Sequence, residues 1–79
     1  MNLDELGLTL RKMYDEAPNG LKTTSIHFFG VKFASEIRDG GFTPREIVGT
    51  AGMKPSYQTE VSKGMRLSKY VTPRPEYRD

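Results

Sequence analysis

A chain of 79 residues holds one small domain, which builds a convex recognition surface more easily than a deep catalytic cleft. It contains no cysteine, which excludes disulfide frameworks and thiolate metal sites, and its apolar runs fall short of the roughly 18–20 residues of a membrane span. Residues 1–39 carry five basic and six acidic side chains, whereas residues 40–79 carry seven basic and four acidic ones. With an acidic start that lacks a signal-peptide core, we expect a cytoplasmic protein.

An amphipathic helix is expected over residues 3–17, where apolar side chains recur at steps of three and four residues. Asn2 is placed to cap its first turn, and the acidic side chains of that turn favour the positive end of the helix dipole. The Pro-Asn-Gly sequence at residues 18–20 is expected to end the helix.

The same apolar spacing predicts a second helix over about residues 25–39. One of residues 23–25 is expected to cap this helix, and the two glycines at residues 40–41 supply a left-handed stop. β-Branched and aromatic residues are frequent in residues 23–33, and Gly30 lies in the middle of the helix, so a strand stays open as the alternative for this stretch.

The third helix has the clearest start in the chain. Thr43 and Glu46 form a capping box, in which the Thr43 hydroxyl accepts from the Glu46 amide and the Glu46 carboxylate accepts from the Thr43 amide. Pro44 takes the first helical position, where a missing N–H costs nothing. We expect this helix to run to residue 50 or 51.

A fourth helix is expected over about residues 55–63, with Gly64 as its stop, and residues 65–71 add room for another helical turn. We assign residues 1–71 to one helical domain. Residues 72–79 hold two prolines and four charges, which predicts a flexible C-terminal tail. The expected fold is all-α, a small bundle of four to five short helices.

The third and fourth helices meet at a corner. Two helices that cross at about 90–120° need a turn of three or four residues, and one of these must tolerate a positive φ. Gly52 is that residue, and Met53 plugs the corner behind it. Ile47, Ala51 and Val61 complete the inner seam, with Ala51 small because the two helices approach closely there.

Residues 42–67 resemble the helix-turn-helix motif of the lambda-repressor-like family of DNA-binding domains. The matching features are the polar cap with its Glu, the Ala-Gly-Met turn, the Ser at the start of the second helix and the closing Lys-Gly-Met-Arg. The chain departs from the family at Val48, where a small residue is usual, and at Gln58, where a buried aliphatic is usual. A rotated second helix that packs Tyr57 instead, or a divergent variant of the motif, would accommodate Gln58.

The resemblance implies that the chain binds double-stranded DNA and that the second helix of the motif enters the major groove with its N-terminal part. The candidate contacts to base edges are Lys54, Ser56, Thr59 and Glu60. The candidate contacts to phosphates are Lys63, Arg66 and Lys69. One such domain buries little surface, so we expect a transcriptional regulator that works as a homodimer, or the DNA-targeting module of a larger assembly.

The sequence gives no sign of a catalytic, metal, cofactor or small-molecule site. His27 is the only histidine, adjacent acidic residues on a helix point in different directions, and a glycine-rich phosphate loop is missing. We therefore do not expect an enzyme, and we expect no membrane association.

A protein-protein interaction or dimerisation module without nucleic-acid binding is the alternative function. Its main support is Phe28, which lies on the far side of the second helix from the apolar stripe, where a partner can reach it. In that case the basic half of the chain is incidental to function. Retention on a DNA or heparin column at moderate salt discriminates between the two functions.

Overall fold

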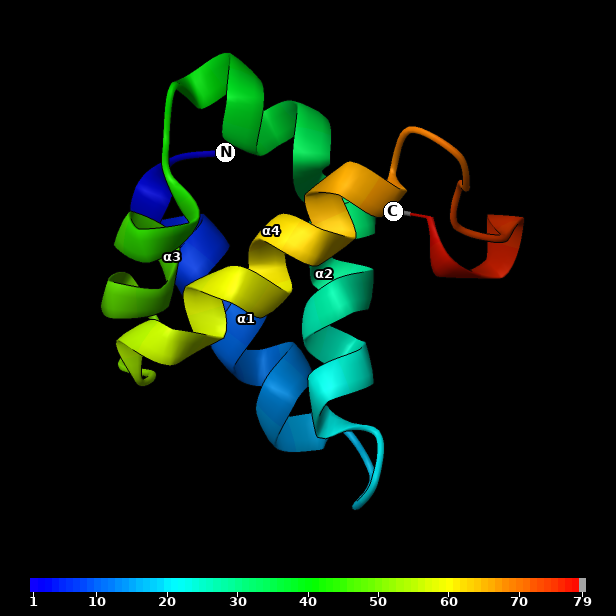
Figure 1. Ribbon diagram of the computed structural model, residues 1–79, viewed down its shortest axis with the longest axis horizontal. Helices are drawn as coiled ribbons and strands as arrows, with labels where there is room; N and C mark the ends of the chain where they lie inside the picture. Colours follow the sequence, from blue (N-terminus) through cyan, green and yellow to red (C-terminus); the bar gives the residue numbers. More distant parts are fainter. Residues whose placement is uncertain (79) are drawn as a thin grey trace.

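Four α-helices build the domain in the computed structural model, which describes residues 1–78 (Figure 1). The elements are α1 (Leu3–Glu16), α2 (Lys22–Gly40), α3 (Pro44–Thr50) and α4 (Gln58–Leu67), with 3₁₀ turns at Pro55–Tyr57 and Pro75–Tyr77. The predicted all-α fold is confirmed, and the strand alternative for residues 23–33 is wrong because α2 contains all of them. Among the described residues, no helix has both the length and the apolar content that a membrane span requires.

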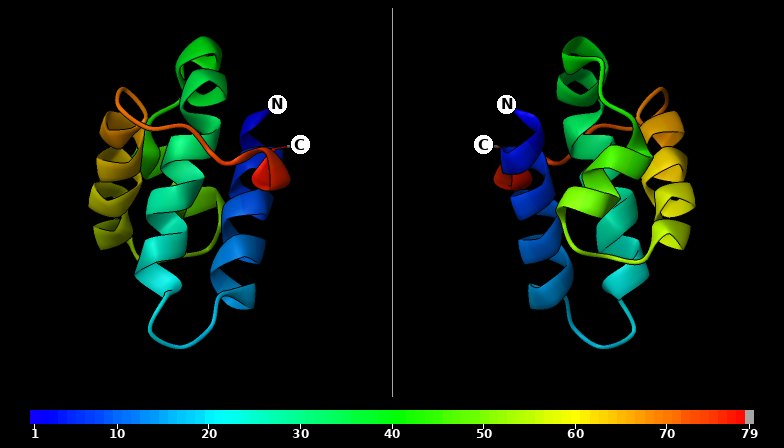
Figure 2. Two further views of the ribbon diagram at one scale, coloured as in Figure 1. Left: turned by 90° about the vertical axis from the view of Figure 1, so that its right-hand side faces the viewer. Right: turned by 90° about the vertical axis from the view of Figure 1, so that its left-hand side faces the viewer.

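The core lies where the four helices meet. α2 lies between α1 and α4 on one side of the domain, and α3 packs against α1 and α4 on the other (Figure 2). The largest fully buried side chains are Leu6, Leu10, Ile26, Phe29, Ile37, Ile47, Val48 and Val61. Burial of each such side chain stabilises the fold by about 1.5–3 kcal/mol, so this core holds all four helices in place.

Helices α1 and α2 begin in different ways. In α1 the Asn2 side chain accepts from the Glu5 amide and the Glu5 carboxylate accepts from the Asn2 amide, so the predicted cap is confirmed as a capping box. α2 begins at Lys22, three residues earlier than predicted, and Leu21 takes its N-cap position without a side-chain hydrogen bond. The prediction that one of residues 23–25 caps α2 is therefore wrong, because all three lie inside the helix.

α2 ends at the two glycines predicted to stop it, although the helix bends before this point. Phe33 has non-helical dihedral angles, φ −111° and ψ 15°, which produce a kink at this buried side chain. The helix then stops at Gly41, whose φ of 70° lies in the left-handed region that favours glycine.

The corner between α3 and α4 forms as predicted. Thr43 and Glu46 make both hydrogen bonds of the capping box, and Pro44 opens the helix. Gly52 has a φ of 71°, and the Met53 amide donates to the carbonyl of Val48 at 3.1 Å. Met53 is 8% exposed, so its side chain closes the corner against the core.

Gly64 does not stop the fourth helix. The 3₁₀ turn Pro55–Tyr57 leads directly into α4, which continues through Gly64 to Leu67. Gly64 is instead the point at which α4 crosses α2, because a Cβ on Gly64 would collide with the carbonyl oxygen of His27. On the opposite helix, a Cβ on Gly30 would lie 2.6 Å from the carbonyl oxygen of Val61. Two glycines therefore let the two backbones touch.

The C-terminal stretch follows a defined path across α2. Its 3₁₀ turn, Pro75–Tyr77, brings the ring of Tyr77 edge-on to that of Phe28, with the ring centroids 5.5 Å apart and the planes at 83°. The proposed domain boundary after residue 71 therefore separates parts that contact each other through these rings. The predicted flexibility of residues 72–79 stays a prediction, and residue 79 lies outside the described residues.

Candidate nucleic-acid interface

Helix α4 has one buried face and one exposed polar face. Val61 is fully buried and Gly64 is buried against α2, so these two residues fix the inner face. Thr59, Lys63 and Arg66 are exposed and follow one another at steps of four and three residues. Residues at this spacing lie on the same side of a helix, so the three form one stripe along the outer face of α4.

Three more of the residues predicted to contact DNA are also exposed, and they flank this stripe at the two ends of α4. Lys54 and Ser56 are exposed at the 3₁₀ turn that leads into the helix. Lys69 is exposed just after the helix ends. The structure thus places six of the seven predicted contact residues on the outer surface of α4 and its two flanks.

Glu60 is the exception, because its carboxylate already has partners inside the protein. Its side chain is 19% exposed, and its Oε1 lies 2.9 Å from Nε2 of His27 on α2. The Lys63 ammonium donates to the same oxygen at 3.3 Å. These contacts, with the hydrogen bond from His27 as the largest cause, lower the pKa of Glu60 below its ordinary value. Glu60 therefore links α4 to α2 at the edge of the exposed stripe.

Tyr57 and Gln58 show how the start of α4 is seated. Tyr57 packs against the core, with its ring centroid 5.6 Å from that of Tyr14 and the two hydroxyl oxygens 3.1 Å apart. This hydrogen bond raises the pKa of Tyr57 above its ordinary value. Gln58 is half-buried, and no buried side-chain nitrogen or oxygen in the described residues lacks a hydrogen-bond partner. The packing of Tyr57 against the core agrees with one of the two alternatives for Gln58, a rotated second helix, while a divergent variant of the motif stays open as the other.

Two features of this region are not predictable from the amino-acid sequence. The contact between His27 and Glu60 joins residues 33 positions apart, and neither residue has a local pattern that indicates the other. Phe28 was identified as an apolar side chain outside the core stripe, but the groove beside it and the return of Tyr77 were not. Both features depend on how α2 is placed against α4 and the tail, which local spacing does not encode.

Comparison with known proteins agrees with the geometry of the corner. No curated protein and no solved structure matches the chain. A family model described as an HTH-like domain matches residues 2–74, which include all four helices. Because this match spans nearly the whole chain and the structure contains the α3–α4 corner with its exposed second helix, the protein belongs to the family of HTH-like domains.

Proposed function

We propose that this domain binds duplex DNA by inserting α4 into the major groove, as a transcriptional regulator or as the DNA-targeting module of a larger assembly. The observation that carries the proposal is the exposed stripe of Thr59, Lys63 and Arg66 on the second helix of the corner. In helix-turn-helix proteins this helix reads the groove, while the preceding helix crosses the backbone. The resemblance of residues 42–67 to lambda-repressor-like domains supports the same placement.

The contacts divide according to their position along α4. Lys54, Ser56 and Thr59 lie at its N-terminal end, which is the part that reaches base edges, and their side chains donate to or accept from bases. Lys63, Arg66 and Lys69 lie at and beyond its C-terminal half, where basic side chains neutralise phosphates. A base contact from Glu60, the remaining predicted contact to base edges, has to compete with the hydrogen bonds that its carboxylate accepts from His27 and Lys63.

A titration of labelled duplex DNA over a range of salt concentrations tests the proposal. Three to five phosphate contacts predict a slope of about −3 to −5 in a plot of log affinity against log salt concentration. Scrambled competitor DNA measures the part of the affinity that depends on sequence. A flat salt response, or no binding at low salt, overturns the DNA-binding proposal.

Thr59→Ala tests which residues read sequence. Because Thr59 lies in the first turn of α4, the change is expected to alter the preferred base at one or two positions by about 1–3 kcal/mol and to leave the salt slope unchanged. Ser35→Ala, at an exposed position of α2 outside the stripe, is the matched control. Selection from randomised duplexes reveals the difference, and identical sequences recovered by the wild type and Thr59→Ala would remove Thr59 from the base contacts.

Protein interaction remains a second function, and one observation favours it. Phe28 lies at an open apolar groove between α2 and the C-terminal tail. Thr59, Lys63 and Arg66 do not line this groove. A partner in the groove therefore leaves the stripe free, so that one domain can carry both functions.

A further inference from the structure

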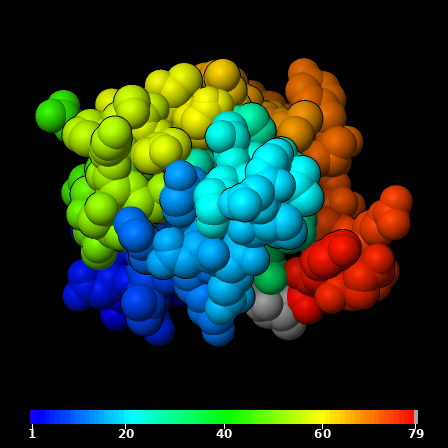
Figure 3. Space-filling view, turned by 90° about the horizontal axis from the view of Figure 1, so that it is seen from below, coloured from blue at the N-terminus to red at the C-terminus, as the bar shows by residue number. Residues whose placement is uncertain are grey.

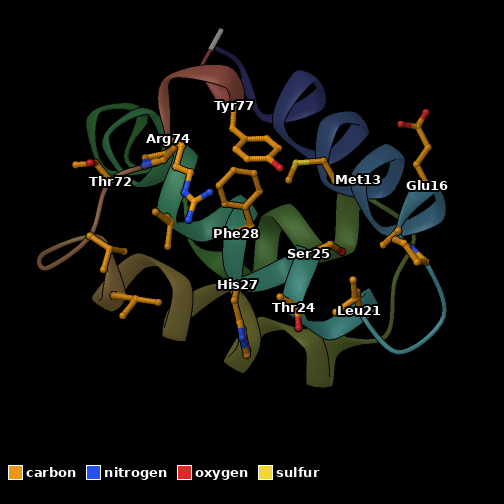
Figure 4. Close-up of a pocket in the computed structure, with 16 residues that line it drawn as sticks. Met13, Glu16, Leu21, Thr24, Ser25, His27, Phe28, Thr72, Arg74 and Tyr77 are labelled. Atoms are coloured by element: carbon orange, nitrogen blue, oxygen red, sulfur yellow. The ribbon is translucent and has the colours of Figure 1, made fainter.

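An apolar groove of about 800 Å³ runs along the side of the domain where the tail crosses α2 (Figure 4). Phe28 and Tyr77 face each other within it, the end of α1 forms one wall, and the segment after α4 forms the other. Its main apolar side chains are Met13, Leu21, Phe28, Leu67, Val71 and Tyr77. The groove is therefore built from three stretches of the chain, residues 13–18, 21–31 and 67–77.

Exposed apolar side chains concentrate at this groove. Among the described residues, seven large hydrophobic side chains are exposed, and four of them line it. These four are Leu21, Leu67, Val71 and Tyr77, with exposed fractions between 44% and 54%. Single exposed apolar residues are normal on a protein surface, but a cluster of them on a domain this small marks an interaction surface.

The charges at the rim indicate what kind of partner fits. Glu16 and Arg74 lie on opposite sides of the Phe28 ring, one at each end of the groove (Figure 4). Neither forms an ion pair within the described residues. A two-fold axis through the middle of the groove brings the acidic end of one copy to the basic end of the other. The groove is thus complementary in charge to itself.

We propose that this groove is the interface of a symmetric homodimer, in which Glu16 of each copy pairs with Arg74 of the other around the Phe28–Tyr77 contact. The proposal deepens the proposed DNA-binding function and rests on it for the expected distance between the two α4 helices. In Figure 3, α4 and the tail lie at different edges of the surface. A two-fold rotation keeps the direction along its axis unchanged. If the axis of the dimer points toward the side that carries α4, both copies therefore present α4 on the same side. Half-sites one helical turn apart require the two α4 helices to lie roughly 34 Å from each other, a distance comparable with the 31 Å of the longest dimension of one domain.

A charge exchange between two single variants tests the pairing in the full chain without DNA. Glu16→Arg puts arginines against arginines in the dimer, and Arg74→Glu puts glutamates against glutamates, so each alone is expected to weaken the dimer about tenfold or more. An equimolar mixture of the two variants restores both pairs and is expected to form a heterodimer. Sedimentation equilibrium over a range of concentrations measures all three. If both single variants dimerise weakly and their mixture also stays monomeric, the proposed pairing of Glu16 with Arg74 is wrong. Each substitution would then act within its own chain, and mixing the two variants cannot reverse such an effect.

Apolar substitutions test the groove itself. Leu67→Glu is expected to weaken the dimer about tenfold or more, whereas Leu8→Glu, at a 73% exposed leucine of α1 outside the groove, is expected to leave it unchanged. Helical circular dichroism should stay the same in both variants, because both leucines are exposed. A wild-type chain that is monomeric up to millimolar concentration, or a dimer weakened equally by both variants, overturns the proposal. A monomer that binds DNA with the expected salt slope contradicts only the dimer, and a stable dimer that ignores DNA contradicts only the proposed function.

Discussion

The inner and outer faces of α4 are built from the same ten residues but are constrained in different ways. On the inner face, Val61 and Gly64 lie against α2 so closely that the backbones touch. On the outer face, Thr59 and Arg66 project into solvent, with Lys63 between them. The difference implies that the fold selects the residues of the inner face, whereas the outer face is left free for the proposed contact with DNA. A substitution on either face should therefore change one property and leave the second nearly untouched.

The largest effect is expected from Gly64→Ala on the inner face. Alanine normally stabilises the interior of a helix relative to glycine by about 0.5–1 kcal/mol. At Gly64 the added Cβ collides with the backbone of α2 at His27, so we expect the free energy of unfolding to fall by about 2–3 kcal/mol instead. Urea or thermal unfolding followed by circular dichroism measures the change.

Gly49→Ala in α3 is the matched control for this prediction. Gly49 also lies inside a helix, but a Cβ there meets no atom within 4 Å, so the ordinary gain from alanine is expected. The two substitutions should thus shift stability in opposite directions. Equal effects from both would show that α2 and α4 do not cross at the two glycines.

A smaller effect is expected at the corner, where the constraint comes from backbone conformation rather than from contact. A Cβ on Gly52 meets nothing within 4 Å, but its φ of 71° is unfavourable for a branched side chain. Gly52→Val is therefore expected to destabilise the domain by more than about 1 kcal/mol. Gly52→Asn should cost less, since asparagine tolerates this conformation, and thermal melting compares the two. If valine and asparagine melt alike, the positive φ is not what glycine provides there.

The corner and the crossing also show what sequence reasoning can reach. Both α1 and α3 caps and the left-handed Gly52 were predictable, because each depends on residues within a few positions of one another. The prediction that Gly64 stops a helix was wrong, because a glycine can either end a helix or allow a neighbouring backbone to approach closely. At Gly64 the close approach of α2 at Gly30 decides between the two, and this contact is not visible in the local sequence. Local patterns identify turns, whereas the meaning of a glycine at a crossing depends on tertiary structure.

The candidate DNA-binding site likewise has some features that were predictable from the sequence and others that were not. Exposure of Thr59, Lys63 and Arg66 followed from the polar face of α4 and was predictable from helical periodicity. The partial burial of Glu60 was not predictable, because it comes from a contact with His27, which lies 33 positions away on α2. The groove at Phe28 was likewise beyond sequence reasoning, since a Pro-rich tail has no pattern that predicts where it returns to the domain.

On the outer face, Arg66→Ala and Lys63→Ala should weaken DNA binding without affecting the fold. Each removes one of the proposed phosphate contacts, so we expect affinity to fall by a similar factor for every sequence and the salt slope to become smaller by about one. Arg38→Ala, in the last turn of α2, is the control for the loss of a positive charge elsewhere. Fluorescence anisotropy at several salt concentrations measures the slopes. If Arg66→Ala, Lys63→Ala and the control Arg38→Ala all gave the same salt slope, Lys63 and Arg66 would contribute no more to DNA binding than a basic residue elsewhere on the surface.

The smallest effect is expected at Glu60, on the boundary between the two faces. The hydrogen bond from His27 lowers the pKa of Glu60 below its ordinary value of 4.5, so folding favours the ionised carboxylate. The stabilisation is fully present above pH 4.5 and is lost as the pH falls below it. The difference in stability between the wild type and Glu60→Gln should therefore narrow on acidification through this range. Glu76→Gln, which removes an exposed carboxylate from the tail, should show no such narrowing.

The same variant decides whether Glu60 reads DNA or holds α4 in position. If Glu60 acts through His27 and Lys63, Glu60→Gln should recover the same sequences as the wild type from randomised duplexes, with a small loss of affinity for all of them. If its carboxylate accepts from a cytosine amino group, the preference at that base pair should relax by about 1–3 kcal/mol. The second result would require the Glu60 carboxylate either to accept from the base through Oε2 or to leave His27 when DNA binds. His27→Ala, which removes one of the two partners of the Glu60 carboxylate and leaves Lys63, should then strengthen that preference rather than weaken it.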